Sequence, residues 1–291
     1  MTERQVFIFL TKFRNAHDVR VLMKHKKITI FNILSIAYRL WRGVPIAKIT
    51  NHKWFYGLEF YTNKHTLDPR PDSETLVEAV LKNEPGARHI IDLGTGTGCL
   101  IISLLKNLPN ATGTAIDISR PALRVAARNR KRHNLESRLT LKRTSFASFS
   151  THFKLSSLRG APATKQSNKK FLRKGFDWIA SLFAYGSRPR NDDKQNTVII
   201  SNPPYIPVGD ESVNTGAHFD PKLALYGGED GLKYYREIAN CKLYIVHCKL
   251  YIEIGCGQET AITKIFTNAG WRPIAKFPDL AGITRVLSFE K

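Results

Sequence analysis

The feature that most constrains the fold is an alternation of apolar strands and helices between residues 90 and 133. Residues 90–93 are typical of a buried strand, and a glycine-rich turn at 94–98 separates them from an apolar helix at 99–108. A second strand at 113–118 and a helix at 121–133 follow. Strands and helices that alternate at this spacing predict a parallel α/β sheet.

The rest of the chain extends this sheet and adds a helical start. Helical spacing of apolar residues through position 42 predicts two or more short helices, and residues 46–68 suit a short hairpin or an extended connector. A helix is expected at 73–81, after Pro71 and with Asp72 or Ser73 as its cap. A further strand is expected at 198–200, and the apolar runs at 243–246 and 250–254 could be a helix end and another strand. The tail at 271–289 is expected to form a closing hairpin.

One segment, residues 146–196, interrupts the regular pattern. It contains ten Lys and Arg residues against three Asp residues, with Ser, Gly, Pro and Asn scattered through it. This composition is more typical of an exposed insertion than of a core element. Residues 176–180 could form a strand within it, and we leave that assignment open.

Composition limits the classes of protein that this chain can belong to. The 291 residues include 45 Lys and Arg against 24 Asp and Glu, a net charge of +21, and 42% are hydrophobic, enough to build a core. The four cysteines include no C-x-x-C pair and the nine histidines no metal-ligand spacing, so neither a disulfide framework nor a metal is expected. No apolar run reaches the roughly 18 residues that a membrane span needs.

The N-terminal region is basic. Residues 1–56 contain only two acidic residues, Glu3 and Asp18. That pattern is found in mitochondrial presequences and in basic arms that face a substrate, and an ordinary basic amphipathic helix is the alternative. We expect a location in the mitochondrial matrix.

The glycine-rich turn, Asp92-Leu93-Gly94-Thr95-Gly96-Thr97-Gly98, is the first motif that indicates chemistry. Glycines between a strand and a helix let the backbone approach a nucleotide-type cofactor closely. The alternating G-x-G-x-G pattern after an acid departs from the G-x-G-x-x-G of dinucleotide enzymes and suits S-adenosylmethionine. Asp117, at the end of the next strand, is placed to accept hydrogen bonds from both ribose hydroxyls. A tight turn without a ligand is the less favoured explanation.

The second motif, Asn202-Pro203-Pro204-Tyr205, follows the strand at 198–200. The nitrogen of a planar amide or ring NH₂ group is a poor nucleophile because its lone pair is delocalised. The Asn202 side-chain oxygen and the Pro203 carbonyl could accept the two N–H protons and stabilise the charge that develops on nitrogen. Tyr205 could pack over the planar group, and the two prolines would stiffen the loop. A proline-rich turn that merely ends a strand is the alternative.

These motifs resemble the class I S-adenosylmethionine-dependent N-methyltransferases, and the flanking segments are similar to HemK-type (PrmC-type) protein-(glutamine-N5) methyltransferases of translation release factors. The resemblance runs from about Gly43 to the C-terminus, and its most discriminating element is Pro69-Arg70-Pro71-Asp72-Ser73-Glu74. It implies a Rossmann-like fold with a mostly parallel seven-stranded sheet and a C-terminal antiparallel hairpin. It also implies methylation of the glutamine in the Gly-Gly-Gln (GGQ) loop of a release factor.

The resemblance also implies roles for particular residues. Catalysis is expected of Asn202, Pro203 and Tyr205, and the glutamine substrate is expected to contact Arg70 and all four residues of the Asn-Pro-Pro-Tyr motif, Pro204 included. Phe146 is the best match to an aromatic residue that flanks the adenine in the family. The full set expected to bind the cofactor is Asp92, Gly94, Thr95, Gly96, Thr97, Gly98, Asp117, Phe146 and Asn202.

The resemblance suggests three parts of the chain. Residues 1–45 would form a shortened helical segment that docks the release factor and carries a targeting sequence at its start. Residues 46–68 would be a connector hairpin, and residues 69–291 the methyltransferase domain with the basic insertion. The family has a longer N-terminal domain and a shorter loop before Asn202, so the docking mode and the role of the insertion stay open.

Two other functions are weighed against this one. The first is an amino-methyltransferase that acts on RNA or DNA bases, because a flipped base presents the same planar NH₂ to the same loop, and the net charge of +21 favours it. Only 86 residues follow Tyr205, which leaves little room for a base-reading domain, so direct nucleic-acid binding is less favoured. A non-enzymatic scaffold is weaker still, because both motifs are intact. Glu253 is interpreted as a polar strand end, with orientation of a cofactor-loop amide as the alternative.

Overall fold

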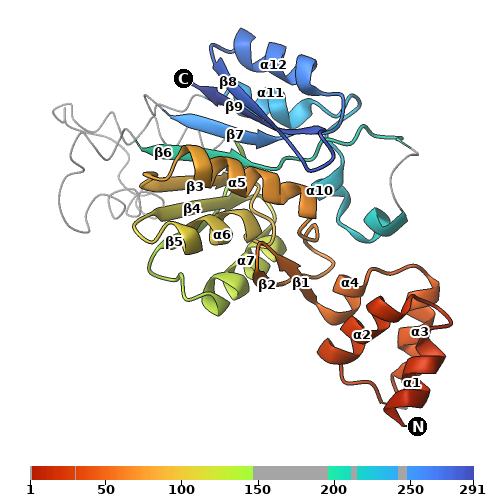
Figure 1. The fold of residues 1–291 in the computed structure, drawn as a ribbon. Helices are drawn as coiled ribbons and strands as arrows, with labels where there is room; N and C mark the ends of the chain where they lie inside the picture. Colours follow the sequence, from red (N-terminus) through yellow and green to blue (C-terminus); the bar gives the residue numbers. More distant parts are fainter. Residues whose placement is uncertain (1, 30, 147–195, 211–214, 242–247) are drawn as a thin grey trace, which may run out of the picture.

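In the computed structural model, a seven-stranded sheet with helices on both faces is joined through a hairpin to a helical N-terminal part (Figure 1). The structure describes residues 2–29, 31–146, 196–210, 215–241 and 248–291. Nearly all of the expected insertion at 146–196, with the strand considered at 176–180, lies outside the described residues, as does the apolar run at 243–246. No helix in the described ranges is long and apolar enough to cross a membrane.

The sheet has the order β5-β4-β3-β6-β7-β9-β8 and confirms the predicted α/β class. The first five strands in this order run parallel, and β9 joins β7 and β8 in antiparallel fashion, so the tail forms the expected hairpin. The strands are β3 (His89–Leu93), β4 (Thr112–Asp117), β5 (Leu139–Arg143), β6 (Thr197–Ser201), β7 (Lys249–Glu253), β8 (Arg272–Pro278) and β9 (Thr284–Glu290).

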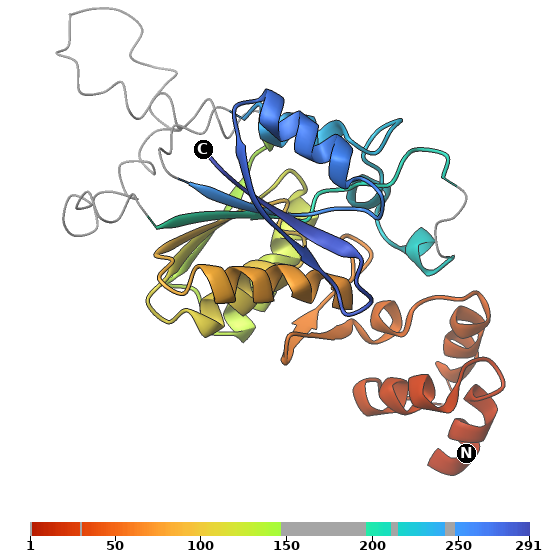
Figure 2. The ribbon, with the colours of Figure 1, turned by 45° about the horizontal axis from the view of Figure 1, so that its top comes forward.

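Helices cover both faces of the sheet (Figure 2), and an apolar core lies on each face, as expected for parallel strands. On one face, the helices α5 (Glu74–Asn83) and α6 (Cys99–Asn107) pack on the strands, with α7 (Arg120–Arg132) beside α6. On the other face, α11 (Lys233–Ala239) and α12 (Glu259–Asn268) surround Trp271. The central strands β3, β6 and β7 are therefore buried on both faces, whereas the edge strand β8 is exposed, and a ligand is expected at the ends of the central strands.

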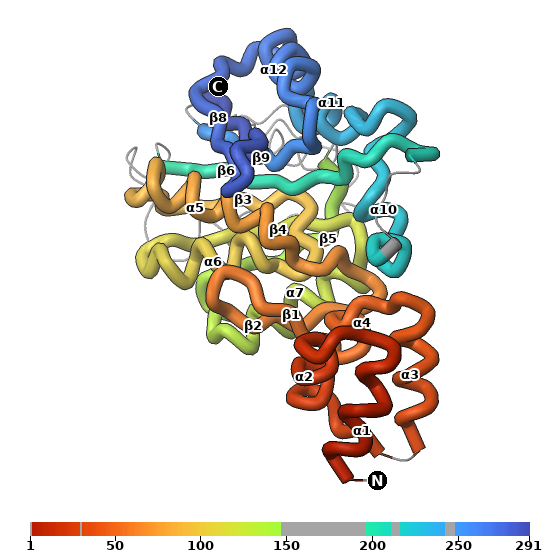
Figure 3. The backbone as a smooth tube through the Cα atoms, turned by 45° about the vertical axis from the view of Figure 1, so that its right-hand side comes forward, coloured from red at the N-terminus to blue at the C-terminus, as the bar shows by residue number. Residues whose placement is uncertain are grey.

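The N-terminal helices form a third core of their own, apart from the sheet (Figure 3). Thr2 and Gln5 make a reciprocal capping box at the first helix, and the side chain of Asn15 caps the second. The helices are α1 (Glu3–Leu10), α2 (Ala16–His25), α3 (Ile33–Trp41) and α4 (Ile46–Thr50). The predicted hairpin follows as β1 (His52–Phe55) and β2 (Leu58–Tyr61), and it connects this helical part to the sheet.

The prediction that Asp72 or Ser73 caps α5 is wrong. The chain forms a short 3₁₀ helix, η1 (Pro71–Ser73), before α5, and the Ser73 side chain makes no capping hydrogen bond. Ser73 instead accepts a hydrogen bond from Asn202, and Asp72 forms an ion pair with Arg285. Three of the elements above, β5, α11 and α12, were not predicted from the sequence. Two short helices, η4 (Thr215–Phe219) and α10 (Lys222–Leu225), were not predicted either.

Candidate active site

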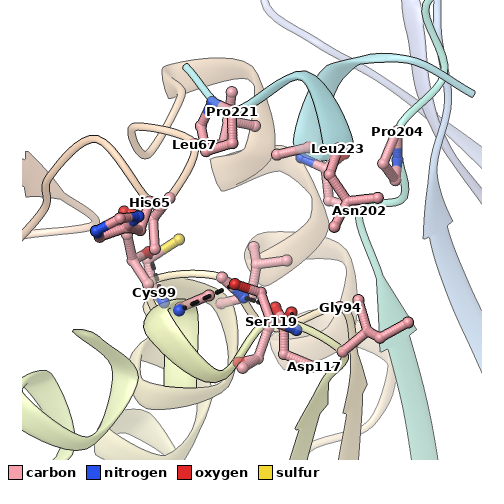
Figure 4. A pocket seen from close by; sticks show the side chains of 18 of the residues that line it. His65, Leu67, Gly94, Cys99, Asp117, Ser119, Asn202, Pro204, Pro221 and Leu223 are labelled. Carbon is pink, nitrogen blue, oxygen red and sulfur yellow. Dashed lines mark hydrogen bonds between the residues drawn. The ribbon is translucent and has the colours of Figure 1, made fainter. Parts of the chain in front are cut away.

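A cavity of about 190 Å³ lies at the carboxyl ends of β3, β4 and β6, where parallel α/β sheets hold their ligands. In Figure 4, Asp117 and Ser119 lie on one side of this cavity, and Asn202 and Pro204 on the other. The two motifs found in the sequence thus supply facing walls of one cavity. Predicted site residues that line it are Arg70, Gly94, Thr95, Gly96, Thr97, Asp117, Phe146, Asn202 and Pro204.

Asp117 organises the wall that the glycine-rich turn provides. Its Oδ2 accepts a hydrogen bond of 2.9 Å from the Gly96 N–H, and its Oδ1 accepts one of 2.8 Å from the Ser119 N–H. Burial raises the pKa of this carboxyl above its ordinary value, and backbone hydrogen bonds oppose that shift. The Ile118 N–H also hydrogen-bonds to this carboxylate. A carboxylate has about four acceptor sites, so it keeps capacity to accept a hydrogen bond from a ligand hydroxyl.

The glycines bring the backbone close to an aromatic ring. Gly94 and Gly96 adopt φ values of 80° and 55°, which side chains other than that of glycine rarely accept. A Cβ atom at Gly94 would lie 3.5 Å from the ring of Phe146. The Phe146 ring therefore lies against the turn and forms part of the same wall of the cavity.

Asp92 lies beneath this wall and does not line the cavity. Its side chain is 1% exposed, and its Oδ2 accepts a hydrogen bond of 2.6 Å from the Thr95 hydroxyl. Its Oδ1 is buried without a hydrogen-bond partner among the described residues. Burial raises the pKa of Asp92 to about 7. The carboxyl supports Thr95 and keeps one acceptor free close to the turn.

Gly98 also lies outside the cavity lining. It has φ 81° at the start of α6, and a Cβ atom there would come within 3.1 Å of Ile102 and 3.6 Å of Ala126. Its small size therefore allows α6 and α7 to pack closely. The neighbouring Thr97 does line the cavity, and its carbonyl accepts a hydrogen bond of 2.8 Å from Asn129 of α7.

The Asn-Pro-Pro-Tyr loop forms the second wall. Asn202 and Pro204 line the cavity, whereas Pro203 and Tyr205 do not. The Tyr205 carbonyl accepts a hydrogen bond of 3.0 Å from Gln258, and burial raises the pKa of the Tyr205 phenol to about 12. The loop is thus held from behind while its first residue faces the cavity.

Glycines behind the loop allow this approach. A Cβ atom at Gly227 would lie 2.5 Å from the Pro204 carbonyl oxygen, and one at Gly231 would lie 2.3 Å from that of Tyr205. Real Cβ atoms do not come so close to backbone oxygens, so these two positions accept no side chain without movement of the loop.

The Pro-Arg-Pro-Asp-Ser-Glu element joins four parts of the fold. The Arg70 guanidinium pairs with Asp220 at 2.7 Å, and Asp72 pairs with Arg285 of β9 at 3.1 Å. Ser73 Oγ accepts a hydrogen bond of 3.1 Å from Asn202 Nδ2, and Glu74 accepts one of 2.7 Å from the Tyr56 N–H of the hairpin. This element, the most discriminating part of the sequence resemblance, therefore holds Asn202, which is expected to act on the substrate.

A buried lysine holds the rim of the cavity. Lys48 Nζ lies 2.8 Å from Asp68 and 2.7 Å from Asp220, and it also donates to the carbonyls of Asn63 and Thr66. Only 7% of the Lys48 residue is exposed. This cation joins α4 to the loop after β2 and to the segment before α10, both of which line the cavity. Local sequence gives no sign of Lys48, because its partners are distant in the chain.

Glu59 is the centre of a second group of charges, away from the cavity. Its carboxylate lies 2.6 Å from His52, 3.6 Å from His25 and 3.1 Å from Arg132. One ligand-type atom from each of Glu59, His52 and His25 lies within 4.8 Å of the others. Sequence spacing gave no sign of this group, because it assembles from α2, the hairpin and α7.

Residues missed in the sequence also line the cavity. Apolar side chains come from the loop after β2 and from α10, and Tyr234 comes from α11 with its ring edge-on to Phe146 at 5.9 Å. They carry no motif, so only the fold reveals them. Figure 4 labels several of these additional residues, namely His65, Leu67, Cys99, Ser119, Pro221 and Leu223.

Comparison with known proteins agrees with this geometry. Residues 64–155 match the Methyltransferase small domain family. A release factor glutamine methyltransferase of Agrobacterium fabrum is 31% identical over 272 residues, which cover 89% of this chain and 78% of the relative. A protein of the same name from Cereibacter sphaeroides is 34% identical over 249 residues, which cover 84% of this chain and 73% of the relative.

Solved structures share the fold at low identity. The catalytic domain of hMettl16, crystallised in complex with the MAT2A 3'UTR hairpin 6, has a TM-score of 0.53 and 12% identity, covering 97% of this chain and 91% of that one. This likeness concerns the fold alone. The two bacterial relatives carry the family assignment: this chain belongs to the release factor glutamine methyltransferase family.

Proposed function

We infer that this chain is an S-adenosylmethionine-dependent protein methyltransferase whose substrate is the side-chain amide of a release-factor glutamine, in the Gly-Gly-Gln loop. The observation that carries this function is the placement of Asn202 across the cavity from the glycine-rich turn. A planar amide held at Asn202 would face whatever cofactor the turn binds. The membership of the family supports the same substrate.

The residues present fit S-adenosylmethionine. Asp117 presents its carboxylate beside the turn for the ribose hydroxyls, and the Phe146 ring lines the cavity next to the turn, where the adenine can pack against it. Asp92 lies beneath the turn and outside the cavity lining, so its carboxylate, when ionised, attracts the positive charge of the methionine part without direct contact. When bound, the cofactor supplies a methyl group to a nucleophilic nitrogen.

The protein's own contribution is to orient the substrate amide. Asn202 Oδ1, which lines the cavity, accepts one of its N–H protons, which favours a lone pair on nitrogen and stabilises positive charge there. The Pro203 carbonyl, expected from the sequence to accept the other proton, lies outside the cavity lining. Prolines at 203 and 204 restrict the loop backbone, so Asn202 is in place before the substrate arrives. Tyr205 stays a neutral phenol at physiological pH, because burial raises its pKa to about 12.

Substrate docking is assigned to the N-terminal helices at 1–45. Three apolar side chains on α3, Leu34, Tyr38 and Trp41, are 72%, 56% and 68% exposed, and Phe31 just before the helix is 96% exposed. Their spacing of three or four residues places them along one side of the helix. A release factor that covers them would be held beside the cavity through the hairpin.

A location in the mitochondrial matrix is proposed from the basic N-terminal residues, since positions 1–56 contain only Glu3 and Asp18 as acids. A C-terminal fluorescent fusion of the full chain should colocalise with a matrix marker. A diffuse cytoplasmic signal would rule the proposal out.

The function is tested by incubating the purified chain with labelled S-adenosylmethionine and purified release factors. Label should enter a release factor with an intact Gly-Gly-Gln loop and should be lost when that glutamine is replaced by alanine. Mass spectrometry of the loop peptide should place one methyl group on the glutamine side chain. Label found only in added RNA would support the base methyltransferase that the charge of +21 favours.

A further inference from the structure

Glu253 is a buried acid beside the cavity, and the proposed reaction does not yet use it. It is the last residue of β7 and only 2% exposed. Its neighbours in the sheet place it next to the end of β6, because Ile252 pairs with Ser201, the residue before Asn202. A buried carboxylate is costly unless its surroundings use its charge, so this position calls for an explanation.

The side chains of Ser73 and Asn202 both hydrogen-bond to the Glu253 carboxylate. Asn202 Nδ2 also donates to Ser73 Oγ at 3.1 Å. A serine hydroxyl can accept one hydrogen bond while it donates another, so Ser73 can link the asparagine to the acid. The Oε2 atom of Glu253 is buried without a partner among the described residues, which leaves the carboxylate with further capacity to accept.

An asparagine side chain can turn over and exchange its oxygen for its NH₂ group with little change in packing. Only one of these orientations presents an acceptor to the substrate. We propose that Glu253 is a positioning residue that, through Ser73 and by direct contact, holds the NH₂ group of Asn202 inward and so presents Asn202 Oδ1 to the substrate amide. This role rests on the proposed function, because it supplies the acceptor that a glutamine side chain needs.

The charge state of Glu253 decides how well it performs this role. An ionised carboxylate only accepts hydrogen bonds, so it selects the NH₂ side of Asn202. A protonated carboxyl also donates, and its O–H can pair with Asn202 Oδ1 and stabilise the wrong orientation. The orientation is therefore secured at a pH where Glu253 has lost its proton.

The surroundings of Glu253 place the loss of its proton close to neutral pH. Burial raises the pKa of Glu253 to about 7, Asp72 adds to the shift, and hydrogen bonds from Ser73 and Asn202 and the charge of Arg285 oppose it. Cys99, Tyr205 and Tyr235 are the other titratable groups that interact with it, and burial raises the pKa of each. All three are therefore neutral near pH 7, and Arg285 stays charged.

The kinetic test compares Glu253→Gln with the wild type at saturating cofactor. Glutamine keeps the size of the acid but always carries a donor, so it imitates the protonated form. We expect kcat to fall by about 10- to 100-fold, with little change in cofactor affinity. In the wild type, kcat should rise with pH through about 7, and in Glu253→Gln this rise should disappear. Retention of the rise in the variant, or a kcat equal to that of the wild type, would refute the proposal.

Two further variants separate positioning from folding. Glu84→Gln is the matched control, because Glu84 accepts hydrogen bonds from Lys249 at the start of β7 and from Tyr251 in its middle, away from Asn202. This variant should leave kcat and its pH dependence unchanged. Ser73→Ala removes the link but keeps the carboxylate, and kcat should fall by about 3- to 10-fold. If Glu253→Gln fails to fold, an unchanged kcat in a folded Ser73→Ala variant still contradicts the proposal.

A measurement without substrate keeps this inference distinct from the proposed function. The side-chain N–H signals of Asn202 in an NMR spectrum, identified by their loss in Asn202→Ala, should shift as pH crosses about 7 in the wild type and stay constant in Glu253→Gln. Constant signals in the wild type would overturn the inference. Shifting signals in a protein that methylates no release factor would support the inference and overturn the proposed function.

Discussion

The two walls of the cavity are built in different ways. On the glycine-rich wall, the bond from the Gly96 N–H to Asp117 spans 21 positions of the chain, and that from the Ser119 N–H spans two. On the Asn-Pro-Pro-Tyr wall, Asn202 reaches Ser73 across 129 positions, and Tyr205 is held by Gln258 across 53. The first wall is made by local backbone, and the second requires the whole sheet to assemble.

The largest effect is expected from the wall that acts on the substrate. Asn202→Ala removes the side-chain acceptor from the substrate amide, and we expect kcat to fall by about 10³-fold, as when a group that stabilises transition-state charge is lost. Methyl transfer from labelled S-adenosylmethionine to a release factor measures the change. Cofactor affinity should fall far less than kcat, and a variant that keeps more than a tenth of wild-type kcat would contradict this role.

Segments distant in sequence hold the Asn-Pro-Pro-Tyr wall in place, and this packing can be disturbed without removal of a polar side chain. Gly227→Ala places a Cβ atom 2.5 Å from the Pro204 carbonyl oxygen, so the loop must move. A displacement of about 1 Å is expected to lower kcat by about 100-fold, with cofactor affinity unchanged. Isothermal titration calorimetry checks that affinity.

Gly86→Ala is the matched control for this change. A Cβ atom at Gly86 would meet only Asn196 Nδ2, at an ordinary 3.7 Å, and kcat should be that of the wild type. If the Gly227 and Gly86 variants have the same kcat, the loop does not depend on close backbone packing.

This difference explains what could be predicted from the sequence. The strands β3 and β4, the turn and Asp117 follow from local spacing, whereas β5 was missed, and the structure places Asp117 beside the turn as expected. The role of Ser73 was predicted wrongly, because the residue has the usual features of a helix cap, and its actual partner, Asn202, is 129 positions away. Lys48 gave no local signal, and Glu253 was interpreted as a polar strand end, since a buried charge is recognised only by the groups that the fold brings to it.

Each wall also has a buried acid behind it, Asp92 behind the glycine-rich turn and Glu253 behind the Asn-Pro-Pro-Tyr loop. Because of Asp92, the stability of the protein should depend on pH. Burial raises the pKa of Asp92 from 3.8 to about 7, so the folded state binds this proton more tightly than the unfolded state. Its contribution to stability is complete at a pH below 3.8 and is lost as pH rises to about 7. Asp92→Asn should abolish this part of the pH dependence.

Urea unfolding of both proteins without cofactor measures the effect. Between about pH 5.5 and 7.5, the wild type should lose on the order of 2 kcal/mol more free energy of unfolding than Asp92→Asn. Glu253 titrates in both proteins, so the difference isolates Asp92. Equal losses in the two proteins would show that Asp92 is ionised at ordinary pH in the folded state.

The smallest effect is expected from the locally built wall. Asp117→Asn keeps one oxygen but replaces the other with an NH₂ group, which cannot accept a hydrogen bond from the Gly96 or Ser119 N–H. One backbone donor and one ribose hydroxyl then lose their acceptor, and we expect S-adenosylmethionine to bind about tenfold more weakly. Because the Asn-Pro-Pro-Tyr wall is intact, kcat at saturating cofactor should stay within about twofold of the wild type. Calorimetry gives the affinity and methyl transfer gives kcat, so the two walls are measured separately. A loss of kcat with unchanged affinity would mean that the walls are coupled, and that the contrast between a local cofactor wall and a long-range substrate wall is wrong.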